Sequence, residues 1–459
     1  MAGGRANGAI RFGAGLGPAV RNIDPGAADL LAELAGPDVL ADTFPAVRTA
    51  AAMDMVARYA PAKRADRGTE AGTAQKDLKD EINAALVESW RAMAARWVDA
   101  EIGFRERLTL FWTDHFTVRA RNARHRALAP AHIEDAVRPH VTGRFADMLK
   151  AAVTHPMMMI YLSQVGSIGP NSATAKKRRA GGGLNENLAR EVLELHTLGV
   201  GGGYGQDDVR QFAELLTGLA LSKDAQPGFR EANAEPGSEE VLGASYGGDP
   251  ARLEDIYAAL DDLAVHPDTA GHIARKLAVH FVSDTPDAGL VGAMADAFAA
   301  TGGDLTAVYA AMLEHPAAWA DPGAKVRWPV DYVLAGARAL GLDGRTLVTM
   351  PRRRFRALLT DQLDVMGQPW LQAPGPDGWP EEAEAWVTPQ GMAARIDWAM
   401  RSPAGLVAAA GGERPDPRGF VEVALGGQAD AALVRAAERA ETREDGVGLI
   451  LASPGFNRR

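Results

Sequence analysis

The residues with the clearest potential for chemistry lie between positions 185 and 198. Glu186, Arg190 and Glu194 follow one another at intervals of four residues, so a helix there places all three on one face. Carboxylates in this arrangement can bind a divalent metal or exchange protons with a substrate, while the arginine binds an anion. We therefore take these three residues as candidate catalytic residues.

Polar residues beside that face extend the set. Glu191 and His196 are further catalytic candidates, and Asn185 and Asn187 are candidates for substrate binding. A carboxylate-bridged di-iron site is not expected, because it needs a glutamate three residues before the histidine and Leu193 stands there. A divalent metal bound by carboxylate and histidine side chains stays open, with its ligands unassigned.

Two structural interpretations compete with the catalytic one. The charges can form an exposed ladder of i, i+4 pairs, each of which stabilises a helix by about 0.2–0.5 kcal/mol. They can also lie buried and paired, which positions the helix without any reaction. The sequence leaves all three interpretations open.

A second candidate lies in an aromatic stretch, where Asp114 and His115 stand between Trp112 and Phe116. Adjacent residues of a helix diverge by about 100°, so only one of the pair faces a given small ligand. We take His115 as a catalytic candidate that could share a pocket with His196. The alternative is a hydrogen-bonded histidine in the core.

Basic and aromatic residues supply two candidate binding regions. A cationic run precedes a glycine-rich stretch and the start of the helix near Asn185. Such a run can form an anion-binding site or a solvated loop. Its candidates for substrate binding are Lys176, Arg178 and Arg179, with Lys177 between them. Tryptophans accompany prolines in 366–380, where Gln368 and Trp379 are candidates for binding a sugar. Tryptophans that fill space between helices are the alternative there.

The elements that must position these residues are predicted to be helices, so the fold is all-α or mainly α. Leu188, Val192, Leu195 and Leu198 form one apolar stripe, and Gly199 stands where that helix would end. Alanine-rich stretches predict further helices near 251–264, 288–301, 330–341 and 429–441.

Composition breaks divide the chain into an N-terminal helical segment, a central helical region, a loop insertion and a C-terminal helical region. The expected ranges are 1–100, 101–223, 224–250 and 251–459. The last of these is expected to form one compact unit with 101–223. Long loops rich in glycine and proline separate the helices.

Composition excludes several classes of function. The net charge of −10 disfavours a general nucleic-acid binder, and the lack of cysteine excludes disulfides and thiolate metal sites. No apolar run is long enough for a membrane span or a signal peptide, so a cytoplasmic location is expected. Signatures of P-loop ATPases, zincin proteases, α/β-hydrolases and dinucleotide-binding folds are missing from the sequence.

Several blocks resemble one family in the same order along the chain. The main block is NENLAREVLELHTLGVGGGYGQDDVRQFAELLTG at 185–218; others are RLTLFWTDHF at 107–116, ARKLAVHFVSD at 274–284 and GQPWLQAPGPDGWP at 367–380. These blocks resemble the bacterial family called domain of unknown function 1800. The resemblance implies a sulfatase- or phosphatase-like partner protein, and many family members are exported. The chain departs from the family at Ala234, where a histidine is common.

Two functions of different kinds follow from these observations. The first is a hydrolase or transferase that acts on an anionic or sugar-containing substrate through the polar cluster on the helix at 185–198. The second is a non-catalytic helical scaffold or binding protein that works with the sulfatase-like partner.

Overall fold

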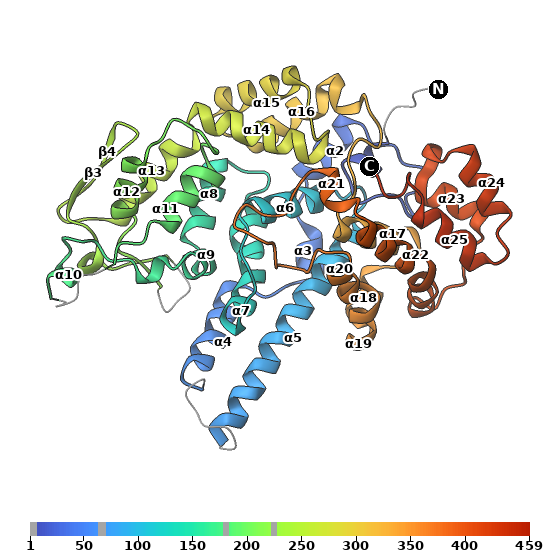
Figure 1. Cartoon of the computed structure of the whole chain (residues 1–459), viewed down its shortest axis with the longest axis horizontal. Coiled ribbons are helices and arrows are strands. Elements are labelled where there is room, and N and C mark those ends of the chain that lie inside the picture. Colours follow the sequence, from blue (N-terminus) through green and yellow to red (C-terminus); the bar gives the residue numbers. More distant parts are fainter. Residues whose placement is uncertain (1–6, 63–69, 178–182, 222–226) are drawn as a thin grey trace.

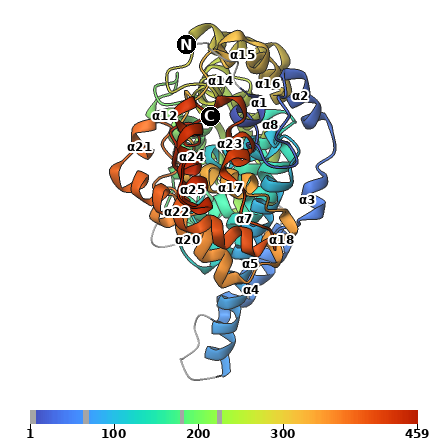
Figure 2. The ribbon, with the colours of Figure 1, turned by 90° about the vertical axis from the view of Figure 1, so that its right-hand side faces the viewer.

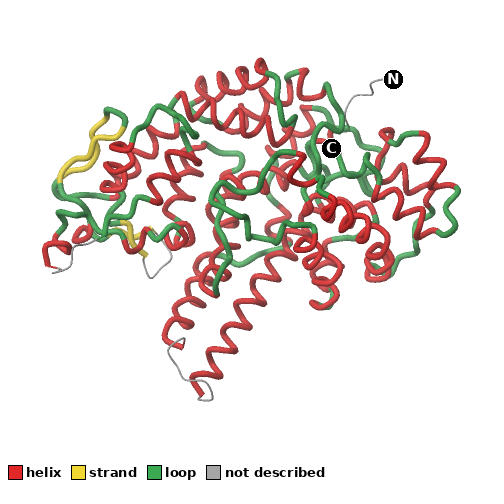
Figure 3. The backbone as a smooth tube through the Cα atoms, viewed as in Figure 1, coloured by secondary structure: helices red, strands yellow, loops and turns green. Residues whose placement is uncertain are grey.

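The computed structural model describes residues 7–62, 70–177, 183–221 and 227–459. The fold is mainly α-helical, as predicted, and Figure 3 shows that the strands of the described residues lie together at one end of the molecule. Four of the predicted alanine-rich helices are confirmed as α13 (Leu253–Ala264), α15 (Ala288–Thr301), α17 (Pro329–Ala339) and α24 (Ala431–Glu438).

The N-terminal part contributes a helical arm that projects from the body. Its two long helices, α4 and α5, run side by side away from the rest of the chain (Figures 1 and 2). The elements here are α1 (Gly8–Arg11), α2 (Ala27–Ala35), α3 (Val39–Thr43), α4 (Thr49–Ala62) and α5 (Glu70–Asp99). Both cores include residues of α5: Ile82 is buried in one, and Trp90 and Trp97 are buried in the other.

The central part is built from short helices. They are α6 (Phe104–His115), α7 (Ala123–His132), η1 (Ile133–Val137), η2 (Arg138–His140), α8 (Phe145–Thr154), α9 (Pro156–Tyr161), η3 (Gln164–Gly166), α10 (Ala173–Lys177), α11 (Asn187–Glu191), η4 (Val192–His196) and α12 (Gln206–Leu215). The predicted helix at 185–198 corresponds to α11 and η4, and it ends before Gly199, whose φ of +85° is one that glycine adopts readily.

Residues 227–250, the described part of the predicted loop at 224–250, contain three strands, which form two antiparallel pairs together with β1 just before them. In the first, β1 (Leu219–Leu221) pairs with β2 (Pro227–Phe229); in the second, β3 (Gly237–Val241) pairs with β4 (Ala244–Gly248). The helix η5 (Glu231–Asn233) lies between them. These strands are short and rich in glycine, so the apolar alternation that reveals a strand in a sequence is weak here.

The remaining helices complete two halves of the body. One half continues with α14 (Pro267–Phe281), α16 (Leu305–Glu314) and η6 (Pro316–Trp319). The other contains α18 (Gly344–Thr349), α19 (Arg352–Phe355), η7 (Arg356–Thr360), α20 (Asp361–Val365), α21 (Ala383–Trp386), α22 (Pro389–Ala409), α23 (Pro417–Leu425), η8 (Gly426–Gln428) and α25 (Arg443–Ala452).

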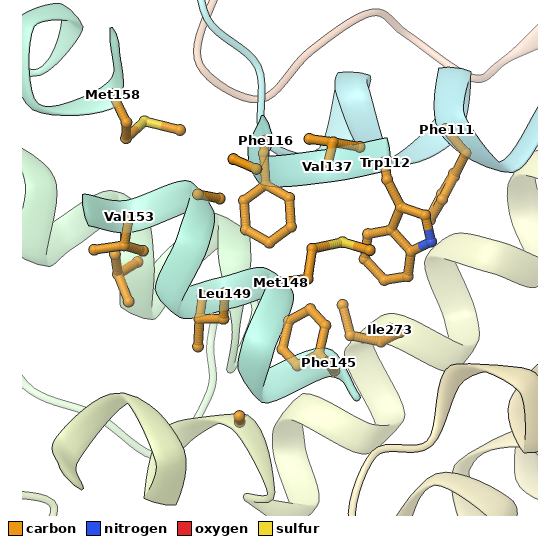
Figure 4. Close-up of a cluster of buried hydrophobic side chains, with 14 of the residues drawn as sticks. Phe111, Trp112, Phe116, Val137, Phe145, Met148, Leu149, Val153, Met158 and Ile273 are labelled. Atoms are coloured by element: carbon orange, nitrogen blue, oxygen red, sulfur yellow. The ribbon is translucent and has the colours of Figure 1, made fainter. Parts of the chain in front are cut away.

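Each of these halves is built around a large hydrophobic core. The first draws its buried residues from Phe12 to Ala318, and Figure 4 shows part of it, with Trp112, Phe116 and Phe145 gathered around Met148. The second is built mainly from residues beyond Val326, together with the end of α5. The first hundred residues therefore contribute to both cores.

A buried ionic cluster lies where the two halves meet. Asp331 of α17 accepts hydrogen bonds from Arg107 of α6 at 2.9 and 3.0 Å and from Arg327 at 2.7 Å. Arg459 lies 3.5 Å from the same carboxylate. Since each of these side chains is almost completely buried, the cluster ties residues from both ends of the sequence to one point.

Candidate active site

The polar block singled out in the sequence forms α11 and η4. Thr197 Oγ1 donates a hydrogen bond to the carbonyl oxygen of Val192 at 2.7 Å, closing the π-helical turn η4. Turns of this kind are rare in proteins, and those that occur are often at functional sites. Leu188 and Leu193 are fully buried on the core side of this helix.

Glu186 and Arg190 form an exposed network with Gln206. Arg190 donates to Glu186 at 3.2 Å and to Gln206 at 2.9 Å, and Gln206 donates to Glu186 at 2.9 Å. The side chains of Glu186 and Arg190 are 34% and 41% exposed. Of the predicted ladder, this geometry shows the Glu186–Arg190 pair, worth about 0.2–0.5 kcal/mol, and no ion pair joins Arg190 to Glu194 among the described residues.

The two asparagines lie at the start of the helix. Asn185 donates through Nδ2 to the carbonyl oxygen of Leu162 at 2.9 Å, and its Oδ1 accepts from the backbone N–H of Asn187 at 3.0 Å. Asn185 thereby fixes the first turn, while the side chain of Asn187 is exposed.

Two histidines cap the C-terminal end of this helix. His272 Nε2 lies 3.1 Å from the carbonyl oxygen of Leu195, and His115 Nε2 lies 3.2 Å from that of His196. Both rings donate, because a carbonyl only accepts, and they satisfy carbonyls that have no partner at a helix end. Burial lowers the pKa of His115 well below its usual value and that of His196 to about 3. The rings of His115 and His196 are therefore neutral and lie in the core.

Glu191 and Glu194 are half-buried on the polar side of the helix. Burial raises the pKa of Glu191, and the nearby carboxylates of Glu194 and Asp377 raise it further. Asp377 belongs to the segment 366–380, so these glutamates lie near that segment. Figure 1 shows the same segment crossing the middle of the molecule between α20 and α21.

The cationic run is only partly described. Lys176 and Lys177 are exposed at the end of α10, while Arg178 and Arg179 lie outside the described residues.

The segment 366–380 closes a small cavity against α6. The cavity has a volume of about 50 Å³, space for a small group or a few water molecules. Its walls include both sugar-binding candidates, Gln368 and Trp379, and one carboxyl group, that of Asp114. The other lining residues are Met93, Leu110, Thr113, Thr117, Val118, Trp328, Val330, Leu363, Pro369, Trp370, Leu371 and Ala373.

Asp114 holds the segment 366–380 in place through hydrogen bonds. The backbone N–H of Trp379 donates to both carboxyl oxygens, at 3.0 and 3.2 Å. The neighbouring Gly378 has a φ of +90°, and a Cβ atom there would lie 2.4 Å from Asp114 Oδ2. The close approach of the segment to Asp114 therefore requires glycine at this position.

The cavity wall changes the acidity of Asp114. Burial raises its pKa to about 8, with the carboxylates of Glu381 and Asp377 adding to the effect. Lys276 and the N–H group of Trp379 oppose this change, but burial outweighs them. Asp114 is thus mainly protonated at neutral pH, which is unusual for an aspartate.

The positive charge of Lys276, in α14, lowers the pKa of Asp114. The side chain of Lys276 is partly buried, and no ion pair or hydrogen bond of its ammonium group is found within the described ranges. Burial lowers the pKa of Lys276, while Asp114, Glu381 and Asp377 raise it in the opposite direction. A carboxyl group and an amine with shifted pKa values in one place are typical of catalytic sites.

The tryptophans around the cavity pack mainly on one another. The ring centroids of Trp370 and Trp90 lie 5.4 Å apart, and those of Trp379 and Trp386 lie 5.8 Å apart. Gln368 is buried, and its Oε1 accepts from the backbone N–H of Val330 at 2.9 Å. These contacts shape the wall and leave space for a small group only.

One protein family matches the chain over a region that includes both cores. Residues 11–458 match the family described as "Protein of unknown function (DUF1800)". The chain belongs to the DUF1800 family. No curated protein and no solved structure was found to match the chain.

Three structural properties of this DUF1800 chain bear on the expectations from its sequence. Ala234 is buried, and its methyl group and the ring of Phe229 pack close to Gly218. No helix among the described residues has the length and apolarity needed to cross a membrane. No group of three or more histidine, aspartate or glutamate side chains in that same part of the chain is arranged to hold a metal.

Sequence reasoning about this DUF1800 chain did not select Asp114 or Lys276. The pair Asp114–His115 was recognised, but His115 was taken as the candidate, and the structure directs His115 to the core and Asp114 to the cavity. A signal for Lys276 was present, because it follows the buried Ile273 by three residues and precedes the buried His280 by four. A lysine on the buried face of a helix is uncommon unless it has a partner or a function.

Proposed function

We propose that this protein is an enzyme, a hydrolase or transferase, in which Asp114 acts as a general acid. The observation that supports this proposal is the position of the Asp114 carboxyl group at the wall of a cavity, where burial raises its pKa to about 8. The substrate is an anionic or sugar-containing molecule, of which one small group enters the cavity. Glu191, on the helix at 185–198, is a further candidate, because burial and the carboxylates of Glu194 and Asp377 raise its pKa.

Asp114 and Lys276 have complementary parts in such a reaction. A protonated carboxyl group can donate its proton to a leaving group, which becomes negatively charged as its bond breaks. The ammonium group of Lys276 stabilises negative charge that develops near it, and the largely apolar wall strengthens this interaction. Proton transfer of this kind contributes about 10²- to 10⁴-fold to a rate.

The test is the variant Asp114→Asn. An asparagine keeps an oxygen that can accept the N–H of Trp379, so we expect the fold to be preserved, but the amide cannot serve as an acid. Turnover of a substrate found by screening aryl glycosides, esters, phosphates and sulfates should fall by about 10²- to 10⁴-fold. Circular dichroism and thermal unfolding check the fold.

Asp99→Asn is the matched control. Asp99 also accepts a backbone N–H, that of Gly344 at 2.7 Å, and burial also raises its pKa. We expect this variant to keep full activity. Undiminished turnover in Asp114→Asn would overturn the proposal. A wild-type chain that turns over none of these compounds and instead captures a sulfatase- or phosphatase-like protein would point to the non-catalytic scaffold.

A further inference from the structure

A run of arginines without ion pairs follows α6. Arg119, Arg121, Arg124 and Arg126 lie within eight residues of the sequence. In the described part of the chain none of them forms an ion pair, although many other arginines do, including the exposed Arg58 and Arg401. The protein carries a net charge of −10, so this concentration of unpaired positive charge is a local feature with a specific location.

This run begins in the wall of the cavity that contains Asp114. Thr117 and Val118 line the cavity, and the following residue is the first of the arginines. The backbone N–H of Ala120 donates to the carbonyl oxygen of Leu371 at 2.9 Å, and Arg119 Nη1 donates to that of Pro374 at 2.9 Å. The start of the arginine run is therefore hydrogen-bonded to the same segment that closes the cavity.

Carboxylates lie close to these arginines. The guanidinium of Arg121 lies over the ring of Tyr161, 5.8 Å from its centroid. Burial raises the pKa of Tyr161. The positive charges of Arg121 and Arg119 lower this pKa, and the carboxylates of Glu191 and Asp377 raise it. The charges of these four groups therefore act on one hydroxyl group. Arg119 is hydrogen-bonded to Pro374, three residues before Asp377, so the segment that closes the cavity carries a carboxylate close in sequence to the residue that this arginine contacts.

This mixture of charges distinguishes between classes of polyanion. A nucleic acid has a negative charge at every nucleotide, and carboxylates among the arginines would repel it. An acidic polysaccharide carries anionic groups that arginine binds with charge-assisted hydrogen bonds and hydroxyl groups that donate to carboxylates. The surroundings of the cavity provide partners for both kinds of group.

We propose that Arg121 and Arg124, with Arg119, bind the anionic groups of an acidic polysaccharide and bring one of its small substituents to the cavity that contains Asp114. This inference rests on the proposed function and names the class of its substrate. The anionic group is a sulfate ester or a carboxylate, since both present oxygens to a guanidinium. The arginines are positioning residues, and the proton still comes from Asp114.

The experiment measures binding of the full chain to dextran sulfate, polygalacturonate and uncharged dextran by calorimetry at two salt concentrations. The variant Arg121→Gln with Arg124→Gln should bind at least one of the anionic polymers about tenfold more weakly, equivalent to about 1.4 kcal/mol. The two polymers distinguish sulfate from carboxylate recognition. Binding should weaken with added salt, because these side chains are exposed.

The matched control replaces two other exposed arginines, Arg345 and Arg353, with glutamine, which changes the net charge by the same amount. We expect this control to bind like the wild type. Equal losses in both double variants, no binding of wild type to either polymer, or tighter binding of a single-stranded oligonucleotide would each overturn the inference. Asp114→Asn should bind the polymer normally, so a failure of the acid role is distinguished from a failure of the arginine site.

Discussion

At the scale of single residues, the site depends on the different surroundings of two neighbours in α6. His115 points into the aromatic core, where burial lowers its pKa and keeps it neutral, and it donates to the carbonyl oxygen of His196. Asp114 reaches the cavity, where burial favours its protonated form. One turn of helix thus provides a structural ring and an acidic proton, because adjacent side chains diverge by about 100°.

The pH dependence of turnover follows from Asp114. Its pKa is about 8, so we expect kcat/KM to fall as pH rises through about 8, when the acid loses its proton. The same change affects stability. Because the folded pKa lies above the unfolded value, the contribution of Asp114 is complete below the unfolded pKa of about 3.9 and is lost as pH rises towards 8. Urea unfolding of wild type and Asp114→Asn across this range measures it; parallel curves would contradict the assignment.

At the scale of elements, the end of the helix made by α11 and η4 is set by contacts with α14. His272 donates to the carbonyl oxygen of Leu195, and Gly199 passes next to the same ring. Lys276 lies one turn further along α14, and the charges of Lys276 and Asp114 each shift the pKa of the other. The family block at 185–218 therefore contacts α14 through the end of its helix, and α14 also carries Lys276.

Replacing Gly199 by alanine tests this contact. Its φ is +85°, and an alanine Cβ would lie 2.7 Å from His272 Nδ1, so we expect a loss of about 2 kcal/mol in the free energy of unfolding. Gly201→Ala is the matched control, because Gly201 has a similar φ of +82° but no atom within 4 Å of that position. Urea denaturation should show a larger loss for Gly199→Ala; equal losses would mean that the contact with His272 adds nothing.

At the scale of the whole molecule, the two cores meet at the buried carboxylate of Asp331. Burial alone would raise its pKa, but Arg107 and Arg327 outweigh burial and lower it. Arg107 belongs to α6, the helix that also carries Asp114. The cluster thus fixes the position of α6 relative to α17, and the cavity lies between residues of these helices and the segment 366–380.

Asp331→Asn should destabilise the protein by about 3 kcal/mol or more, because buried guanidinium groups lose their carboxylate. Because the folded pKa is depressed, the contribution of Asp331 is present above its unfolded pKa of about 3.9 and is lost as pH falls. Asp397→Asn is the control: it breaks an i, i+4 pair with Arg401 that is exposed, and should cost less than about 1 kcal/mol. Similar losses in both variants at pH 7 would argue against a buried cluster.

The amino-acid sequence by itself determined the mainly helical fold, the helix that ends before Gly199 and the family. Apolar spacing, alanine content and a terminating glycine act locally, so they can be recognised without the tertiary structure. Only the tertiary structure decided which polar residues come together. The contact between Asp114 and Trp379 joins residues 265 positions apart, and Lys276 comes from a third segment. Helix periodicity indicates that Asp114 and His115 diverge, but the burial that gives Asp114 its proton depends on what packs against it.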